Sequence, residues 1–406
     1  MRDARNSPAE TIFKHEPGSN ARFFLCHSSD PWYAYLRERY IMQNRSMIVP
    51  ACAGLAIATT LGFAGAGPVI HESGWSLESN FPFTNPMSAL INPDDGFIYL
   101  GIRSGDLYRA DSIGNTEVLL QTDDIAGISH DPSTGALFFS EDFPGNIMRV
   151  DLNSDGTATE TTWVSGFHSG DDDPVGITPV PLDYSGTLLT PGMMVSTDRG
   201  FNGANDIWTW SPTVAQDEIQ IRDDNGTLID TVDIAVQGST IAMADRGGGI
   251  KLLADDASVS TLSTTGATFT EAQGIVFDTR SMDLLVIDAD HDAVYRVSPS
   301  GEASLMFSGL GISTTNWGGI NIDDDGTTQR IVISSVDNDR VYVFSITPPC
   351  SDADLAGPFG QLDFFDVSAF LSAYNAQEPE ADFNNDGIFN FFDVSAFLSV
   401  FNAGCP

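Results

Sequence analysis

The chain has 406 residues, which is enough for two or more domains with sizeable cores. It contains 18 Lys and Arg residues and 56 Asp and Glu residues, so the formal net charge is -38. Such a chain repels phosphate backbones and anionic lipid surfaces, which excludes nucleic acid as an expected partner. So acidic a surface also needs counterions, and we therefore expect salt to stabilise the fold.

Residues 1–66 are predicted to be an N-terminal extension and signal peptide. An uncharged apolar run, 47–67, ends in small residues, and this layout is typical of secretory signals cleaved after Ala66. Because the run lies far from Met1, a start at Met42 would give the usual short leader. The chain is then secreted or displayed at the cell surface, with no membrane segment left after cleavage. An uncleaved membrane anchor is the alternative, since such a run is long enough to span a bilayer.

Residues 67–348 are predicted to form an all-β domain. Short β-branched or aromatic runs are separated by Gly, Asp, Asn and Pro, and no helical period is present. One pattern of three strands with an acidic second turn recurs every 37 to 56 residues or so, which suits a four-stranded blade. The six copies begin near Leu90, Gly127, Gly176, Val232, Gly274 and Gly318. The sequence thus predicts a six-bladed β-propeller.

These repeats resemble NHL-repeat and gluconolactonase-like propellers in pattern rather than in a diagnostic motif. The resemblance implies a lactonase, a lyase or a pure binding scaffold, and the fold does not choose among them. Gluconolactonase-like enzymes hold a catalytic metal on the propeller axis with carboxylate and Asn ligands from separate blades. The candidates here follow the second strand of a blade: Glu141, Asp142, Asp198, Asn202, Asp245, Asp288 and Asp290. A solvated acidic turn is the alternative interpretation, and the one favoured.

Three tryptophans are candidates for the floor of a carbohydrate-binding face: Trp208, Trp210 and Trp317. Trp on a strand more often packs between blades, which is the alternative.

Residues 349–406 are predicted to form a small α domain after the Pro348-Pro349 linker. The segments "LDFFDVSAFLSAYNA" from Leu362 and "FNFFDVSAFLSVFNA" from Phe389 agree at eleven of fifteen positions, so this region is an internal duplication. In both copies apolar residues follow with helical spacing. Each copy is therefore a loop followed by one helix.

The second loop, residues 382–393, has side-chain oxygens at positions 1, 3, 5, 9 and 12 and a glycine at position 6. This pattern predicts an all-oxygen Ca²⁺ site. Its ligands would be Asp382, Asn384, Asp386, the Ile388 carbonyl, Asn390 and Asp393. The alternative is an Asx-rich turn without an ion. The first loop contains an insertion, and a weaker Ca²⁺ site is predicted there from Asp354, Asp363 and Asp366.

The tail from about Cys350 to Pro406 resembles a type I dockerin: two loop–helix repeats with Asp at position 12, bracketed by cysteines and ending "NAGCP". The resemblance implies a calcium-stabilised fold that docks a secreted protein onto a cohesin-type partner. Dockerins commonly recognise the partner through positions 10 and 11, which here are Phe364, Phe365, Phe391 and Phe392. If exposed, these form an aromatic hot spot presented twice. The alternative is that one Phe of each pair packs into the core.

Two of the four cysteines, Cys26 and Cys52, precede the predicted cleavage site, which leaves Cys350 and Cys405 in the mature chain. In an exported protein these two are predicted to form a disulfide, with two free thiols as the alternative.

Together these observations predict a secreted propeller that acts as a binding scaffold and is anchored through calcium-dependent docking. The alternative is a metal-dependent hydrolase, lactonase or lyase on carbohydrate, carried by the same propeller. Three or four carboxylates or Asn side chains converging on the axis would favour the enzyme, and an axis plugged by apolar side chains would favour the scaffold.

Overall fold

The computed structural model describes residues 67–405, except 104, 142–144, 167–172, 200–204, 223–225, 316–317, 358 and 385. The predicted signal peptide therefore lies outside the described residues, as do three candidates from the sequence, Asp142, Asn202 and Trp317. Within the described part, no helix is both long and apolar enough to cross a membrane.

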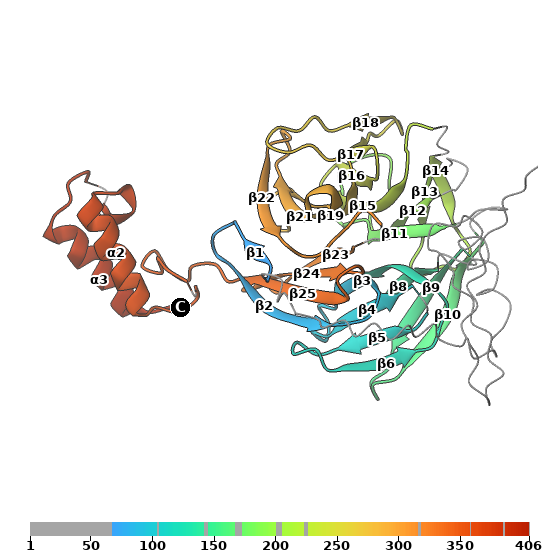
Figure 1. The fold of residues 1–406 in the computed structure, drawn as a ribbon, viewed down its shortest axis with the longest axis horizontal. Coiled ribbons are helices and arrows are strands. Elements are labelled where there is room, and N and C mark those ends of the chain that lie inside the picture. Colours follow the sequence, from blue (N-terminus) through green and yellow to red (C-terminus); the bar gives the residue numbers. More distant parts are fainter. Residues whose placement is uncertain are drawn as a thin grey trace, which may run out of the picture. The chain divides into compact units, whose positions relative to one another are not determined.

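The strands from Trp75 to Ile346 form six antiparallel sheets, which confirms the predicted six-bladed β-propeller (Figure 1). The first blade contains β3 (Pro86–Ile91), β4 (Ile98–Ile102), β5 (Leu107–Ala110) and β6 (Thr116–Leu120). The second contains β7 (Ile125–His130), β8 (Leu137–Glu141), β9 (Asn146–Leu152) and β10 (Ala158–Ser165). The third contains β11 (Pro174–Pro179), β12 (Met194–Arg199), β13 (Asn205–Trp210) and β14 (Ile219–Arg222).

The fourth blade contains β15 (Thr231–Gln237), β16 (Thr240–Asp245), β17 (Gly249–Leu253) and β18 (Val259–Thr261). The fifth contains β19 (Ala272–Phe277), β20 (Leu284–Asp288), the 3₁₀ turn η1 (Ala289–His291), β21 (Ala293–Val297) and β22 (Ala303–Ser308), with β1 (Val69–Ile70) at its outer edge. The sixth contains β23 (Ile320–Asp324), β24 (Gln329–Ser335), β25 (Arg340–Ile346) and, as its outer strand, β2 (Trp75–Pro82).

The ring is closed by strand pairing between the two ends of the propeller. β2 comes from the start of the described chain and pairs antiparallel with β25, from Trp75 opposite Ile346 to Pro82 opposite Arg340. The first strands of the blades, β3, β7, β11, β15, β19 and β23, contact one another in this order around the axis, and β23 returns to β3. We call these six the inner strands.

Neighbouring inner strands approach closely because most of them have a small residue at one equivalent position. A Cβ atom on Gly127 of β7 would lie 1.9 Å from the Val175 carbonyl oxygen of β11, and one on Gly176 would lie 2.6 Å from the Cα of Asp233. No side chain fits into either space without moving backbone, so the sequence pattern of the repeat reflects the packing of one blade on the next.

Apolar side chains fill the spaces between blades. Trp208 and Trp210 are buried and pack with Phe138 of the second blade, whose ring centroid lies 4.9 Å from that of Trp210. These two tryptophans therefore belong to the core between blades two and three, as the alternative interpretation has it, and they do not floor a carbohydrate-binding face.

The tail contains two helices of equal length, α2 (Phe364–Ala376) and α3 (Phe391–Ala403), with the 3₁₀ turn η2 (Pro379–Ala381) between them (Figure 1). Asp363 caps the first turn of α2 and Asn390 caps that of α3, each within a capping box. The helices pack through buried Phe370 and Phe397, whose rings stack at 4.1 Å between centroids.

Candidate functional site

Asp198 and Asp245 lie near the ends of second strands, and each is buried and binds the segment that enters the inner strand of its own blade. Asp245 accepts the amides of Ile229 and Asp230 at 2.9 and 2.7 Å. Asp198 accepts the amide of Asp173 at 2.9 Å in the same way. The carboxylates therefore fix loops, which explains why an acid recurs at this point of the repeat.

The other members of this set that the structure describes also have protein partners. Glu141 accepts from the Thr122 hydroxyl at 3.2 Å and from the Asn146 side-chain amide at 2.9 Å. Asp288 pairs with the ring of His291, and Asp290 accepts from the Thr270 hydroxyl. Burial raises the pKa of three of these carboxyls, those of Glu141, Asp245 and Asp288.

The predicted axial ligands do not come together in the described residues. There, the one group of three or more His, Cys, Asp or Glu side chains with ligand atoms within 4.8 Å of one another is Cys350, Asp354 and Cys405. Its two sulfur atoms are bonded to each other, so it is not a metal site.

An axial channel of about 750 Å³ runs between the inner strands. All six inner strands contribute to its lining, mainly with apolar side chains such as Ile177, Ile275 and Ile320. The lining also includes residues from turns after the inner strands, such as Pro93, Pro132, Pro181, Asp183 and Thr279. The channel thus reaches the face where the inner strands end, while the buried acids described above lie at the opposite ends of the blades.

One carboxyl group lies inside this channel. Asp233 is the third residue of β15, where the repeat has Gly127, Gly176, Gly274 and Gly319 in other blades and Ser88 in the first. Its side chain accepts the amide of Ile234 and, across the blade junction, the amide of Ile275, both at 2.9 Å. Burial raises the pKa of Asp233 to about 7, although these two hydrogen bonds favour the charged form.

Other blade junctions are bridged by a hydroxyl group instead. The Ser140 hydroxyl accepts the amide of Gly127 at 2.8 Å and donates to the Val175 carbonyl of the next blade at 2.9 Å. Ser334 makes the equivalent pair of bonds between the sixth and first blades. The residue at this position of the fourth blade is Ala244, opposite Asp233. Here the carboxyl joins the two blades instead, by accepting an amide of the next blade where the hydroxyls donate to a carbonyl.

Sequence reasoning missed Asp233, although a signal was present. Aligning "DIAVQ" from Asp233 with "GIVFD" from Gly274 puts an acid where the repeat has glycine. An acid that replaces the small residue at the tightest point of a repeat must face either a partner or a cavity.

Charged groups at the mouth of the channel are mostly paired. His130 lies 3.0 Å from a carboxylate oxygen of Asp94. Arg280 binds both oxygens of Asp324 at 2.7 and 2.8 Å, and mainly for this reason the pKa of Asp324 falls to about 2. Burial raises the pKa of Asp323 beside it, and Arg330 is 3.8 Å from that carboxylate.

The second loop of the tail has the turn that the sequence predicts. Gly387 has a φ of +75°, and the Asp382 carboxylate accepts the amides of Asp386 and Gly387 at 3.0 and 2.8 Å. Asp393 accepts the amide of Asn390 at 2.8 Å, and the side chains of Asn384 and Asp386 are exposed. Five side-chain oxygens in one short loop form a donor set that fits a hard cation.

The carboxylates of the first loop also accept backbone amides. Asp366 is buried and accepts three of them, those of Leu355 and Ala356 at 2.8 Å and that of Asp363 at 2.7 Å. Asp354 accepts the amides of Cys350 and Gly360 at 2.8 and 2.7 Å, and the Asp363 carboxylate caps α2. The three carboxylates of the predicted weak Ca²⁺ site thus all accept backbone amides, and the site stays a prediction.

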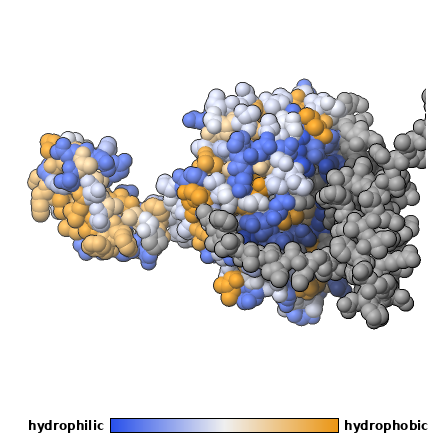
Figure 2. Space-filling model, viewed as in Figure 1, coloured by the Kyte–Doolittle hydropathy of each residue, from blue (hydrophilic) through white to orange (hydrophobic). Residues whose placement is uncertain are grey.

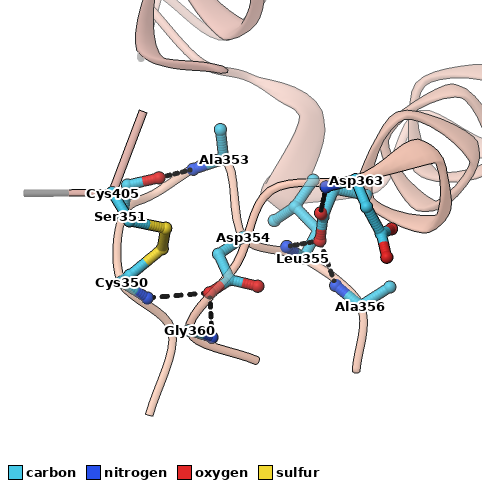
Figure 3. Close-up of a disulfide and its surroundings, with 10 residues drawn as sticks. Cys350, Ser351, Ala353, Asp354, Leu355, Ala356, Gly360, Asp363 and Cys405 are labelled. Atoms are coloured by element: carbon cyan, nitrogen blue, oxygen red, sulfur yellow. Dashed lines mark hydrogen bonds between the residues drawn. A yellow bond between two sulfur atoms is a disulfide. The ribbon is translucent and has the colours of Figure 1, made fainter. Parts of the chain in front are cut away.

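Cys350 and Cys405 are joined in a disulfide, with their Cα atoms 5.2 Å apart (Figure 3). The bond ties the start of the tail to its end.

All four aromatic residues at loop positions 10 and 11 lie on the surface. Phe364, Phe365, Phe391 and Phe392 are 76, 58, 76 and 68% exposed, and hydrophobic residues gather over α2 and α3 in Figure 2. The core position belongs to Phe370 and its counterpart in α3 instead. The alternative that one Phe of each pair packs into the core is therefore not what the structure has.

The fold is a six-bladed β-propeller with a cavity between its inner strands, and comparison with known proteins agrees on the fold. No family model matches the chain, and no curated protein matches its sequence. A gluconolactonase from Xanthomonas campestris is 16% identical, with a TM-score of 0.51, over 69% of this chain and 95% of that one. Virginiamycin B lyase from Staphylococcus aureus is 13% identical, with a TM-score of 0.45, over 67% of this chain and 99% of the lyase. Regucalcin from Agrobacterium tumefaciens is 12% identical, with a TM-score of 0.49, over 66% of this chain and 90% of regucalcin. At such identities the first likeness shows the propeller fold alone.

Proposed function

We propose that the propeller binds a small molecule in its axial channel. The observation that carries this proposal is a cavity of about 750 Å³ with a mainly apolar lining and one interior carboxyl, that of Asp233. Ligand sites in proteins are typically concave, mainly apolar and about 300 to 1,000 Å³ in volume, with a few polar groups that fix the ligand. A scaffold that only presents its outer surface needs no such space.

The experiment is a ligand-observed NMR screen of small amphiphilic molecules against the full chain, with hexan-1-ol as the first probe. Binding that Thr178→Trp abolishes supports the proposal, because this half-buried residue lines the channel and a larger side chain there fills it. The matched control is Thr162→Trp, which makes the same change at an exposed position of the outer strand β10. Binding that survives Thr178→Trp, or that Thr162→Trp abolishes equally, would count against the channel.

We further propose that the tail docks the chain onto a protein partner, of the cohesin type that its resemblance to dockerins implies. Four exposed Phe side chains at the starts of α2 and α3 support this, because aromatic side chains dominate the binding energy of many interfaces. Export to an oxidising compartment is part of this proposal, and the Cys350–Cys405 disulfide supports it.

Calcium enters this proposal through the second loop alone. Asp382, Asn384, Asp386, Asn390 and Asp393 supply five side-chain oxygens of the kind that a Ca²⁺ ion prefers, whereas the insertion in the first loop displaces Asp354 from the position that Asp382 has in the second. We therefore expect one Ca²⁺ per chain in calorimetric titration. Asp386→Asn should weaken binding at least tenfold, and Asp352→Asn, at an exposed position outside the loop, should leave it unchanged.

A pull-down with the full chain, with and without calcium, tests the docking. Phe392→Ser should abolish capture of the partner while the melting temperature stays within a few degrees of the wild type, because this ring is 68% exposed. Loss of folding in that variant would instead mean that the ring stabilises the domain.

The enzyme alternative is a lactonase or lyase reaction in the same channel. The observation that favours it is Asp233, since a carboxyl with a pKa of about 7 exchanges protons readily near neutral pH. The lactonase version is tested with glucono-δ-lactone as the substrate, and a pH-stat measures the acid that hydrolysis releases. Turnover that Asp233→Asn lowers at least a hundredfold supports an enzyme, and turnover no faster than the uncatalysed reaction argues for binding alone.

A further inference from the structure

The charged side chains that line the axial channel are acidic, apart from one histidine. Among the described residues of the lining they are His130, Asp183, Asp233, Asp323 and Asp324. Arg280 and Arg330 lie beside Asp324 and Asp323, and Asp183 is exposed at the mouth. Asp233 is therefore the carboxyl inside the channel that has no basic side chain among its hydrogen-bond partners.

We propose that the channel binds an organic cation, with an apolar body along the inner strands and an ammonium group beside Asp233. This inference rests on the proposed function of the channel and names the class of its ligand. An ammonium group is the complement of a half-buried carboxylate such as that of Asp233, and the apolar lining contacts the rest of the molecule. The net charge of -38 also raises the local concentration of cations around the protein.

Binding of a cation is coupled to the ionisation of Asp233. A nearby positive charge favours the carboxylate and lowers its pKa. Burial otherwise holds the pKa at about 7, so an ammonium ligand releases a proton from the protein when it binds at pH 6. A neutral ligand of the same shape releases none, which gives a readout that does not depend on any variant.

The test compares hexylammonium with hexan-1-ol by isothermal titration calorimetry on the full chain. We expect hexylammonium to bind at least tenfold more tightly than the alcohol at pH 8.5, and its affinity to fall at least tenfold at pH 5.5, where Asp233 is protonated. The affinity for hexan-1-ol should change less than twofold. Titrations at pH 6 in buffers of different ionisation enthalpy should show proton release with hexylammonium alone.

Asp233→Asn should remove the preference for the ammonium group and leave the affinity for hexan-1-ol within about threefold. The matched controls are Asp183→Asn at the mouth and His130→Gln, which removes the histidine of the described lining. Both should keep the tenfold preference.

The outcomes separate the two proposals. Equal binding of both probes, or a preference that survives Asp233→Asn, would overturn the cation inference and leave a channel that binds neutral molecules. Failure of both probes to bind would overturn the channel proposal and this inference together. If Asp233→Asn does not fold, the pH dependence and the proton release of the wild type decide alone.

Discussion

Replacing Asp233 by Asn should make the stability of the propeller less dependent on pH. In the folded chain burial raises the pKa of this carboxyl from 3.8 to about 7. Between pH 3.8 and about pH 7 the folded protein therefore keeps a proton on Asp233 that the unfolded chain releases. Stability contributed by the protonated side chain is present below pH 3.8 and is lost as pH rises toward 7. The loss is about 1.4 kcal/mol per pH unit, or on the order of 4 kcal/mol across the window.

The Asp233→Asn variant has no charge to bury at this position, so it lacks this loss. It should be less stable than the wild type at pH 4, because one oxygen cannot serve the amides of both Ile234 and Ile275. The difference should shrink and then reverse as the pH rises to 8. The assay is urea unfolding of both proteins at pH 4, 5.5, 7 and 8, and all other titrating groups cancel in the comparison.

Two results would refute this reasoning. A stability difference that stays constant from pH 4 to 8 would mean that Asp233 has an ordinary pKa. A difference that grows with pH would mean that a cation inside the protein stabilises the charged carboxylate. Repeating the series at two salt concentrations checks that the effect comes from a buried group, since screening weakens the interactions of exposed charges much more.

Three further predictions concern the packing of each domain. Gly127→Ala should prevent folding or lower the melting temperature by more than 10 °C, because its Cβ would lie 1.9 Å from a backbone carbonyl oxygen. Gly357→Ala, whose Cβ would have no atom within 4 Å, should change the melting temperature by less than 2 °C in the same thermal scan. Cys350→Ser should destabilise the tail by about 4 kcal/mol in urea unfolding, from the loop entropy of a separation of 55 residues, and an unchanged midpoint would show that the disulfide is unimportant. Phe370→Ala should cost about 3 to 5 kcal/mol because this ring is buried, whereas Phe364→Ala, which is 76% exposed, should cost less than about 0.5 kcal/mol.

The blades and the tail could be predicted because their signals are local and repeated. Six copies of one strand pattern leave few architectures, and each copy became a blade. The spacing of Asp363 and Asn390 from the acids three residues later predicts helix starts, and both capping boxes are present. Cys350 and Cys405 are the two cysteines outside the predicted signal peptide, so their pairing needed no geometry.

The direction of each acidic side chain could not be predicted, because it depends on what lies beside the strand in space. Asp245 and Asp198 follow the second strands as expected, but they turn back to the entering loop and not to the axis. In the tail, Asp366 and Asp393 hold equivalent positions of the duplicated sequence, and both accept backbone amides from the loop before their helix. A motif gives the residue type at a position and not the partner that the fold brings to it.

The choice of Asp at position 233 is not explained by the packing of the blades. A hydroxyl bridge such as that of Ser140 joins two blades without burying a charge, and such a hydrogen bond contributes about 0.5 to 1.5 kcal/mol. The carboxyl makes a comparable bridge but loses on the order of 4 kcal/mol by pH 8. Other blades use an uncharged residue at this position, so Asp233 destabilises the fold without need. Such a residue is expected where function requires it.

The double variant Asp233→Gly with Ala244→Ser tests this argument directly. It gives the fourth blade the pattern of the second, with glycine on the inner strand and serine opposite to it. We expect it to be more stable than the wild type at pH 8 by about 2 to 4 kcal/mol in urea unfolding, and to bind hexylammonium no better than hexan-1-ol. A variant that is less stable than the wild type at pH 8 would show that the carboxyl is there for the packing of the blades, and the functional interpretation of Asp233 would then lose its physical basis.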